Sequence, residues 1–248
     1  MVSFRLLFFI TASVLLTRCE SQSNDKQQHK TKTQKDSVAA ISTVVVKENK
    51  PPEKYILPQN RRYIFDSIST ENAVEFFTEY GKKNPETKIK IETRLGTIIA
   101  KLYEDTPIHR ASFIYLVKMG YYNTTCFYRV VPDFIVQGGN SDNLVTPAFK
   151  EQLHDYKIPA EFRKNRGHKR GCMAAARDWV NNPEKMSSPF EFYFIQATKD
   201  QSHLNFEHTV FGEIINGIEV IDKITKVAID RYEWPEKEIP MKITVLKN

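Results

Sequence analysis

The sequence predicts a mainly β protein: a closed antiparallel barrel capped by two helices, with a helical extension before it. Short runs rich in β-branched and aromatic residues follow one another from residue 88 to residue 246. Only two amphipathic helical patterns interrupt these runs, and no internal repeat is visible, which favours a barrel over a repeat architecture. The chain has 248 residues, of which 41% are hydrophobic, so it can bury a full core.

The predicted domain begins with a hairpin, because Lys88–Thr93 and Thr97–Tyr103 both alternate apolar with polar residues around a glycine turn. A helix is expected from Pro107 to Gly120, where a Thr-Pro start, apolar residues at helical spacing and a closing glycine coincide. A second helix is expected from Gly217 to about Lys226. The remaining strands are predicted at Cys126–Val131, Phe134–Gln137, Cys172–Ala176, Phe190–Ile195, Thr209–Ile214 and Met241–Leu246.

Residues 1–19 predict an export signal. Arg5 precedes a nearly unbroken apolar stretch from Leu6 to Leu16 that is too short to anchor the chain across a bilayer, as in a signal peptide. Cys19 follows this stretch and resembles the lipidated cysteine of bacterial lipoproteins, although Arg18 stands where a small residue is usual. We favour a membrane-anchored lipoprotein of the bacterial cell envelope, facing the periplasm or the cell surface. Ordinary signal cleavage, which would give a soluble periplasmic protein, is the alternative.

A polar tether and a helical extension separate this signal from the domain. Residues 20–56 are dominated by Ser, Gln, Lys, Asp and Thr, a composition too polar to offset its ordering entropy. Residues 57–87 contain an aromatic pattern at helical spacing between Ser69 and Gly81, which predicts a helix that docks on the domain. The domain itself is expected to cover residues 88–248.

Charge and cysteine content exclude several classes of protein. The net charge of +6 is not concentrated in a basic run with interleaved aromatics, so we expect a solvated basic surface and no nucleic-acid partner. Cys19, Cys126 and Cys172 are too few and too dispersed for a disulfide framework or a zinc site, and the six histidines lack ligand spacing. We expect Cys126 and Cys172 to be buried free thiols in preference to a disulfide. We also expect a monomer without metal or cofactor.

The run from Phe127 to Gly139, FYRVVPDFIVQGG, carries the strongest functional signal. It places Arg129 in an otherwise apolar strand, where the desolvation of a guanidinium requires pairing or a function. This run resembles the catalytic-arginine signature of the cyclophilins, a family of peptidyl-prolyl cis-trans isomerases. Four motifs occur in the family's order along residues 88–248: TPIHRASFIYLV, GCMAAA, EFY and HTVFGE.

The resemblance implies an enzyme that rotates Xaa-Pro peptide bonds without a covalent intermediate or a cofactor. Arg129, Gln137 and His208 would be its catalytic residues. A fixed cation favours the twisted bond, because the proline nitrogen regains its lone pair only when amide resonance is lost. The residues that the resemblance assigns to the substrate groove are Phe134, Ile135, Ala174, Ala175, Ala176, Glu191, Tyr193, His203 and Leu204.

Four of these positions depart from the residues that are usual in the family. Ala175 replaces an asparagine, Tyr193 replaces a phenylalanine, and His203 stands where many members carry a tryptophan associated with cyclosporin binding. Glu191 replaces a glutamine that usually helps to hold the arginine. A carboxylate there could ion-pair with Arg129, which would orient the guanidinium but also partly neutralise its field, so this substitution most threatens activity.

The leading hypothesis is an active peptidyl-prolyl isomerase, tethered by lipid, that assists the folding of exported proteins. Its partners would be proline-containing polypeptides and the membrane. The alternative keeps the fold without turnover: a proline-peptide binding module or chaperone on the envelope, in which Glu191 has quenched Arg129. A structural or adhesive surface lipoprotein is a third class, against which the intact Arg129, Gln137 and His208 argue.

Overall fold

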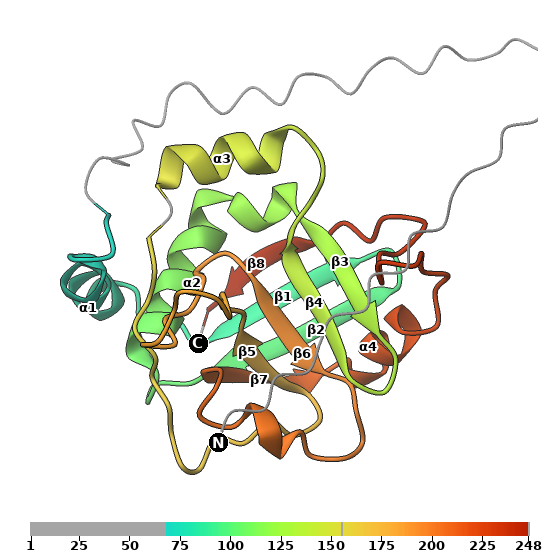
Figure 1. Cartoon of the computed structure of the whole chain (residues 1–248). Coiled ribbons are helices and arrows are strands. Elements are labelled where there is room, and N and C mark those ends of the chain that lie inside the picture. Colours follow the sequence, from blue (N-terminus) through green and yellow to red (C-terminus); the bar gives the residue numbers. More distant parts are fainter. Residues whose placement is uncertain (1–67, 155, 248) are drawn as a thin grey trace, which may run out of the picture. The chain divides into compact units, whose positions relative to one another are not determined.

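The computed structural model describes residues 68–154 and 156–247 (Figure 1). The predicted export signal, its lipid site at Cys19 and the tether lie outside the described residues. The helices are α1 (Ala73–Lys83), α2 (Pro107–Met119), α3 (Val145–Leu153) and α4 (Ile218–Ile224), with single 3-10 turns at Tyr121–Thr124 and Ser202–Leu204. The strands are β1 (Lys88–Thr93), β2 (Gly96–Leu102), β3 (Cys126–Val131), β4 (Ile135–Asn140), β5 (Cys172–Ala175), β6 (Phe192–Ile195), β7 (Val210–Asn216) and β8 (Lys242–Leu246). None of the helices in these two ranges has the length and apolar character that a membrane span requires.

The strands form one eight-stranded antiparallel sheet in the order β3-β4-β6-β5-β7-β2-β1-β8. The prediction of a closed barrel was wrong, because the sheet curls into an open half-barrel whose edge strands β3 and β8 form no ladder with each other (Figure 1). The two edges meet at an isolated bridge between Cys126 and Pro240. The Phe127 N–H donates to the Ile239 carbonyl at 3.0 Å beside this bridge. Pro240 has no N–H to donate, so the pairing does not extend into a ladder.

Four helices accompany the sheet in the described part of the chain, rather than two caps and an extension. The helix that the sequence did not predict is α3. Its start is capped by Asn143, whose Oδ1 accepts the N–H groups of Val145 and Thr146, each at 2.9 Å. The sequence contains two signals for this helix, Asn143 at its start and Pro147 in its first turn, but it lacks the clear apolar periodicity that would have predicted a helix.

Helix α1 packs against α2 (Figure 1) and contributes the fully buried Phe77 to the core. Gly81 was expected to end this helix, but it lies inside it. An added Cβ at Gly81 would stand 3.1 Å from the Ala111 Cβ, so this glycine permits close helix packing. The end of α1 is held by Arg110 of α2, whose Nη1 donates to the Asn84 carbonyl at 2.9 Å.

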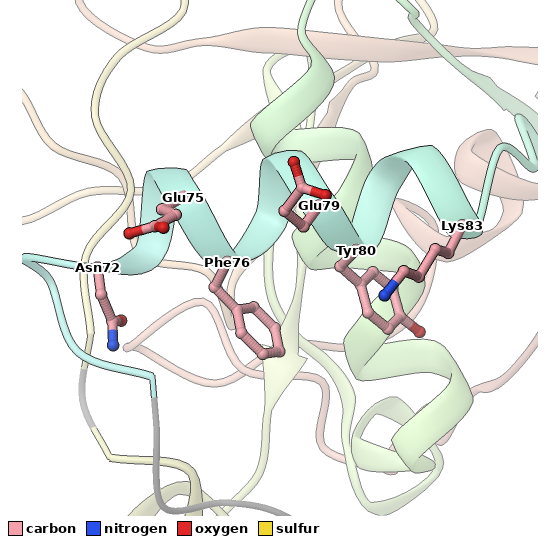
Figure 2. A pocket seen from close by; sticks show the side chains of 6 residues that line it. All are labelled: Asn72, Glu75, Phe76, Glu79, Tyr80 and Lys83. Carbon is pink, nitrogen blue, oxygen red and sulfur yellow. The ribbon is translucent and has the colours of Figure 1, made fainter.

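An open hollow lies along one face of α1. Figure 2 shows Phe76 and Tyr80 side by side in it, and their rings stack with centroids 6.1 Å apart. The residues that line it are Asn72, Glu75, Phe76, Glu79, Tyr80 and Lys83. None of them belongs to the predicted groove, so this hollow is separate from the predicted site.

Helix α2 begins at Pro107 after Thr106 and is closed by Gly120, as the sequence predicted, but its first turn is capped by a different residue. Gly120 has φ 83°, in the left-handed region that glycine favours, and it closes the helix. The Thr106 side chain makes no capping bond. The Glu161 carboxylate accepts the Ile108 N–H at 3.2 Å and the His109 N–H at 2.9 Å instead. A negative charge is stabilising at a helix N-terminus, and only the folded chain brings this one there.

The sheet separates two apolar clusters. The main core lies between the sheet and α2, where the rings of Phe113 and Phe192 meet edge-on at 5.4 Å. Because successive residues of a strand point to opposite faces, Phe194 joins the main core while Tyr193 and Ile195 face the other side. The buried members of this smaller cluster are Tyr103, Ile135, Cys172, Ala174, Tyr193, Ile195, Ala197, Leu204 and Val210. Several predicted groove residues therefore share one face of the sheet.

Candidate active site

The candidate active site is built on one row of side chains across four adjacent strands. Arg129 of β3 pairs with Gln137 of β4. Gln137 pairs in turn with Tyr193 of β6, which pairs with Ala174 of β5. Neighbouring strands lie about 4.8 Å apart, so this row spans about 14 Å. The sheet thus aligns four predicted residues that are distant in the sequence.

An irregularity in β3 directs Arg129 away from the core. The register between β3 and β4 shifts between Phe127 and Arg129, so Tyr128 is an extra residue in the ladder, as in a β-bulge. Phe127 and Val130 are fully buried in the main core, whereas the Arg129 side chain is 37% exposed. The bulge explains how an apolar strand accommodates an arginine.

The Gly-Gly pair at the end of the arginine motif allows β4 to pass close to its neighbours. Gly139 has φ 98°, and an added Cβ there would collide with the Phe190 carbonyl oxygen. At Gly138 an added Cβ would stand 3.0 Å from the Phe127 ring. These two glycines therefore let Gln137 keep its register opposite Arg129.

Apolar side chains lie next to the row, where a proline ring is expected to bind. Ile135, Tyr193 and Leu204 are buried members of the smaller cluster, and the half-buried Phe134 packs against them. The His203 ring lies nearly parallel to the Phe134 ring, with centroids 6.0 Å apart. The structure thus brings these five predicted groove residues to one side of the sheet.

His208 borders this apolar surface as a neutral ring. Its Nδ1–H donates to the Ala175 carbonyl at 3.0 Å, and its ring meets the Tyr193 ring edge-on at 5.6 Å. Burial lowers the pKa of His208 from 6.5 to about 4, and the nearby Arg177 guanidinium acts in the same direction. The imidazole is therefore uncharged at neutral pH, which suits a pocket wall better than a proton donor.

His168 is a site residue that the sequence reasoning missed. Its Nε2 lies 3.0 Å from the Tyr193 hydroxyl, and its Nδ1 lies 3.0 Å from the Asn205 Oδ1. Because the amide oxygen only accepts, Nδ1 carries the proton and the Tyr193 O–H donates to Nε2. Burial lowers the pKa of His168 as well. The available signal was Tyr193 itself, since a buried hydroxyl requires a partner.

The arginine pairs with a residue that the sequence did not suggest. Arg129 Nε donates to Glu233 Oε2 at 2.7 Å. The ion pair that the sequence allowed between Glu191 and Arg129 does not form: among the described residues, no hydrogen bond or ion pair joins those two side chains. Glu233 comes from the loop between α4 and β8, so only the folded chain places it beside β3.

Glu191 belongs to a different polar cluster. Its carboxylate accepts the Tyr128 hydroxyl at 3.0 Å and the Lys150 ammonium of α3 at 3.1 Å. The Gln137 side chain donates to the same Tyr128 hydroxyl rather than to Arg129. Lys150 therefore offsets the charge of Glu191, and neither Gln137 nor Glu191 holds the arginine.

The three predicted alanines differ in where they lie. Ala174 belongs to the smaller cluster on the site face, whereas the Ala175 side chain lies in the main core. The Ala175 N–H donates to the Thr209 carbonyl at 3.0 Å, and its carbonyl accepts His208. Ala176 follows β5, and its N–H donates to the Glu191 carbonyl at 2.9 Å. The structure therefore does not bring the Ala175 side chain to the groove.

The loop after β5 is fixed beside His208. The Arg177 side chain is only 4% exposed, and its Nη2 donates to Glu207 Oε2 at 2.7 Å. Its guanidinium also lies over the Trp179 ring, 4.1 Å from the centroid. Trp179, whose ring meets His208 edge-on at 5.3 Å, is a second neighbour of the site that the sequence reasoning missed.

Cys126 and Cys172 are free and buried, in agreement with the prediction. Burial raises the pKa of each thiol to about 12, so neither is a thiolate at neutral pH. Across residues 68–154 and 156–247, no three His, Cys, Asp or Glu side chains are grouped as a metal site requires. The chemistry that this site offers is a fixed cation beside an apolar surface.

Known proteins resemble part of this chain in sequence. Residues 88–246 match the family described as cyclophilin type peptidyl-prolyl cis-trans isomerase/CLD. The chain is 35% identical over 152 residues to a peptidyl-prolyl cis-trans isomerase of Acinetobacter baylyi, covering 59% of this chain and 76% of that protein. It is 28% identical over 169 residues to peptidyl-prolyl cis-trans isomerase B of Escherichia coli, covering 64% of this chain and 96% of that protein. The chain therefore belongs to the cyclophilin-type peptidyl-prolyl cis-trans isomerase family.

Solved structures agree on the fold. A cyclophilin type peptidyl-prolyl cis-trans isomerase of Cryptosporidium parvum, crystallised in the presence of the dipeptide Ala-Pro, matches with a TM-score of 0.54. The match covers 65% of this chain and 99% of that one, at 24% sequence identity. At this identity the likeness supports the mainly β cyclophilin fold alone.

Proposed function

We propose that this chain is an active peptidyl-prolyl cis-trans isomerase that assists the folding of exported, proline-containing polypeptides at the bacterial cell envelope. The observation that carries the enzymatic part is the row from Arg129 to Ala174, which sets a cation beside an apolar surface. Membership of the family supports the same reaction.

The reaction requires only that the twisted amide be favoured. The rotation barrier of a peptide bond is about 20 kcal/mol, while the two isomers of an Xaa-Pro bond differ by about 1 kcal/mol. Phe134, Ile135, Tyr193 and Leu204 would hold the proline ring away from water. The Arg129 guanidinium would then donate to the proline nitrogen, whose lone pair localises only in the twisted state.

The contacts of Arg129 favour turnover over a silent binding module. Glu233 contacts Nε, and no hydrogen bond engages either Nη group among the described residues. The ion pair is more than a third exposed on both sides, so solvent screens much of the charge of the carboxylate. The cation therefore keeps donors that can reach a substrate.

The decisive experiment measures cis-trans exchange of a Xaa-Pro tetrapeptide by a protease-coupled assay or by NMR exchange. We expect acceleration by the wild type and a fall of about 100-fold or more in kcat/KM for Arg129→Ala. Arg94→Ala is the control, because Arg94 is exposed and its bonds are to the Lys237 and Glu238 carbonyls. A folded wild type that binds the peptide without accelerating exchange would favour the binding module instead.

Anchoring through Cys19 forms the cellular part of the proposal. The apolar stretch before Cys19 and the polar composition of residues 20–56 support a lipid anchor and a spacer. Labelling of cells with radioactive palmitate, followed by separation of the membrane and soluble fractions, tests the lipid anchor. We expect a labelled wild type in the membrane fraction and an unlabelled Cys19→Ala variant. An unlabelled wild type in the soluble fraction would leave the alternative of ordinary secretory cleavage.

A further inference from the structure

We infer that Glu233 is a positioning residue for the isomerase reaction: it fixes the Arg129 guanidinium through Nε and leaves both Nη groups for the substrate. This inference rests on the proposed function, because it assumes that Arg129 is the catalytic cation. It concerns a residue from the loop between α4 and β8, outside all four motifs by which the sequence resembles its family.

The contact is directional. Arg129 Nε donates to Glu233 Oε2 at 2.7 Å, which is the length of a charge-assisted hydrogen bond. A guanidinium has five donors in a planar fork, and holding it at Nε orients the plane while the outer donors stay available. In the described part of the chain, no hydrogen bond or ion pair joins Arg129 to any other side chain.

The loop that carries Glu233 is itself fixed to β3. The Val130 N–H, next to Arg129 in the chain, donates to the Glu233 carbonyl at 2.8 Å. The Trp234 ring contacts the Tyr128 ring, with centroids 5.4 Å apart. On one side of Arg129, Val130 is therefore joined to Glu233, and on the other side Tyr128 contacts Trp234.

The backbone at Glu233 supports the same conclusion. Glu233 has φ 68°, a conformation that a residue with a side chain adopts only when its surroundings hold it there. Asp230 provides part of this hold, because its Oδ1 accepts the N–H of Tyr232 at 2.8 Å and that of Trp234 at 3.0 Å. The carboxylate thus stands on a rigid turn and not on a free loop.

Arg129 needs such a partner because the neighbouring polar residues are engaged elsewhere. Gln137, its cross-strand neighbour, donates to Tyr128, and Glu191 pairs with Lys150. An unheld arginine samples many rotamers, and ordering it when substrate binds would raise the barrier. Glu233 removes that ordering step in advance.

The test compares three variants in the Xaa-Pro exchange assay. We expect Glu233→Ala to lower kcat/KM by about tenfold, mainly through kcat, because the lost orientation acts in the transition state. Glu233→Gln keeps an oxygen that accepts from Nε, so we expect its kcat/KM to stay within about twofold of the wild type. Glu236→Ala is the control, since Glu236 is an exposed carboxylate on the same loop.

A second measurement checks the contact directly. The ¹⁵N–¹H signal of Arg129 Nε, assigned with Arg129→Lys, should exchange slowly in the wild type and in Glu233→Gln and rapidly in Glu233→Ala. If Glu233→Ala melts early, Glu233→Asp replaces it, because the shorter side chain preserves the charge but cannot keep the 2.7 Å contact.

The outcomes separate this inference from the proposed function. An active wild type with unchanged Glu233→Ala kinetics would overturn only the role of Glu233. Higher activity in both Glu233→Ala and Glu233→Gln would also overturn it, because the carboxylate would then be a quencher. An inactive but folded wild type would remove the proposed function, and the positioning role with it.

Discussion

Acidification should weaken this fold through His208 in a defined pH window. Its pKa is lowered mainly by burial, from 6.5 to about 4, so the unfolded chain binds the proton before the folded protein does. The contribution of His208 to stability is therefore constant above about pH 6.5 and is lost as the pH drops toward about 4. Integrated between about pH 7 and about pH 4.5, this difference corresponds to a loss of about 2 kcal/mol.

Urea titrations followed by tryptophan fluorescence test this magnitude at both pH values. His208→Gln can still donate to the Ala175 carbonyl but does not titrate, so it should lose about 2 kcal/mol less on acidification than the wild type. Carboxylates whose pKa values are lowered by paired cations, such as Asp222 beside Arg170, weaken both proteins equally. His203→Gln, at an exposed histidine, is the control. Equal losses in the wild type and His208→Gln would refute the reasoning.

Three further outcomes follow from buried groups. Tyr193→Phe leaves Nε2 of His168 without its donor, so we expect the free energy of unfolding to fall by about 1–3 kcal/mol in a urea titration. Isomerase activity should be retained. An unchanged free energy of unfolding would contradict the hydrogen bond. Gly139→Ala sets a Cβ against the Phe190 carbonyl oxygen at φ 98°, so its melting temperature should fall by several degrees. Gly167→Ala meets only ordinary contacts and should melt like the wild type; similar melting of the two variants would argue against strain. Both buried cysteines should react with Ellman's reagent only after unfolding, because burial raises their pKa values to about 12. Peptide mass mapping of the labelled thiols would show whether either one reacts earlier.

The amino-acid sequence alone identified the features that depend on local pattern. The β1–β2 hairpin followed from alternating residues, and the end of α2 followed from Gly120. Arg129 stood out because a guanidinium has no packing role in an apolar strand. Each of these signals is contained in a few adjacent residues, since strand alternation, helix periodicity and glycine's left-handed conformations are properties of the local chain.

Contacts between residues that are distant in the sequence were decided only by the tertiary structure. Glu191 and Glu233 carry the same carboxylate group, and the path of the loop before β8 decides which of them reaches Arg129. In the same way the folded chain brings Glu161 to the start of α2 and His168 to the Tyr193 hydroxyl. The physical reason is that a hydrogen bond depends on atoms within about 3 Å, and long-range packing sets that distance while local pattern does not.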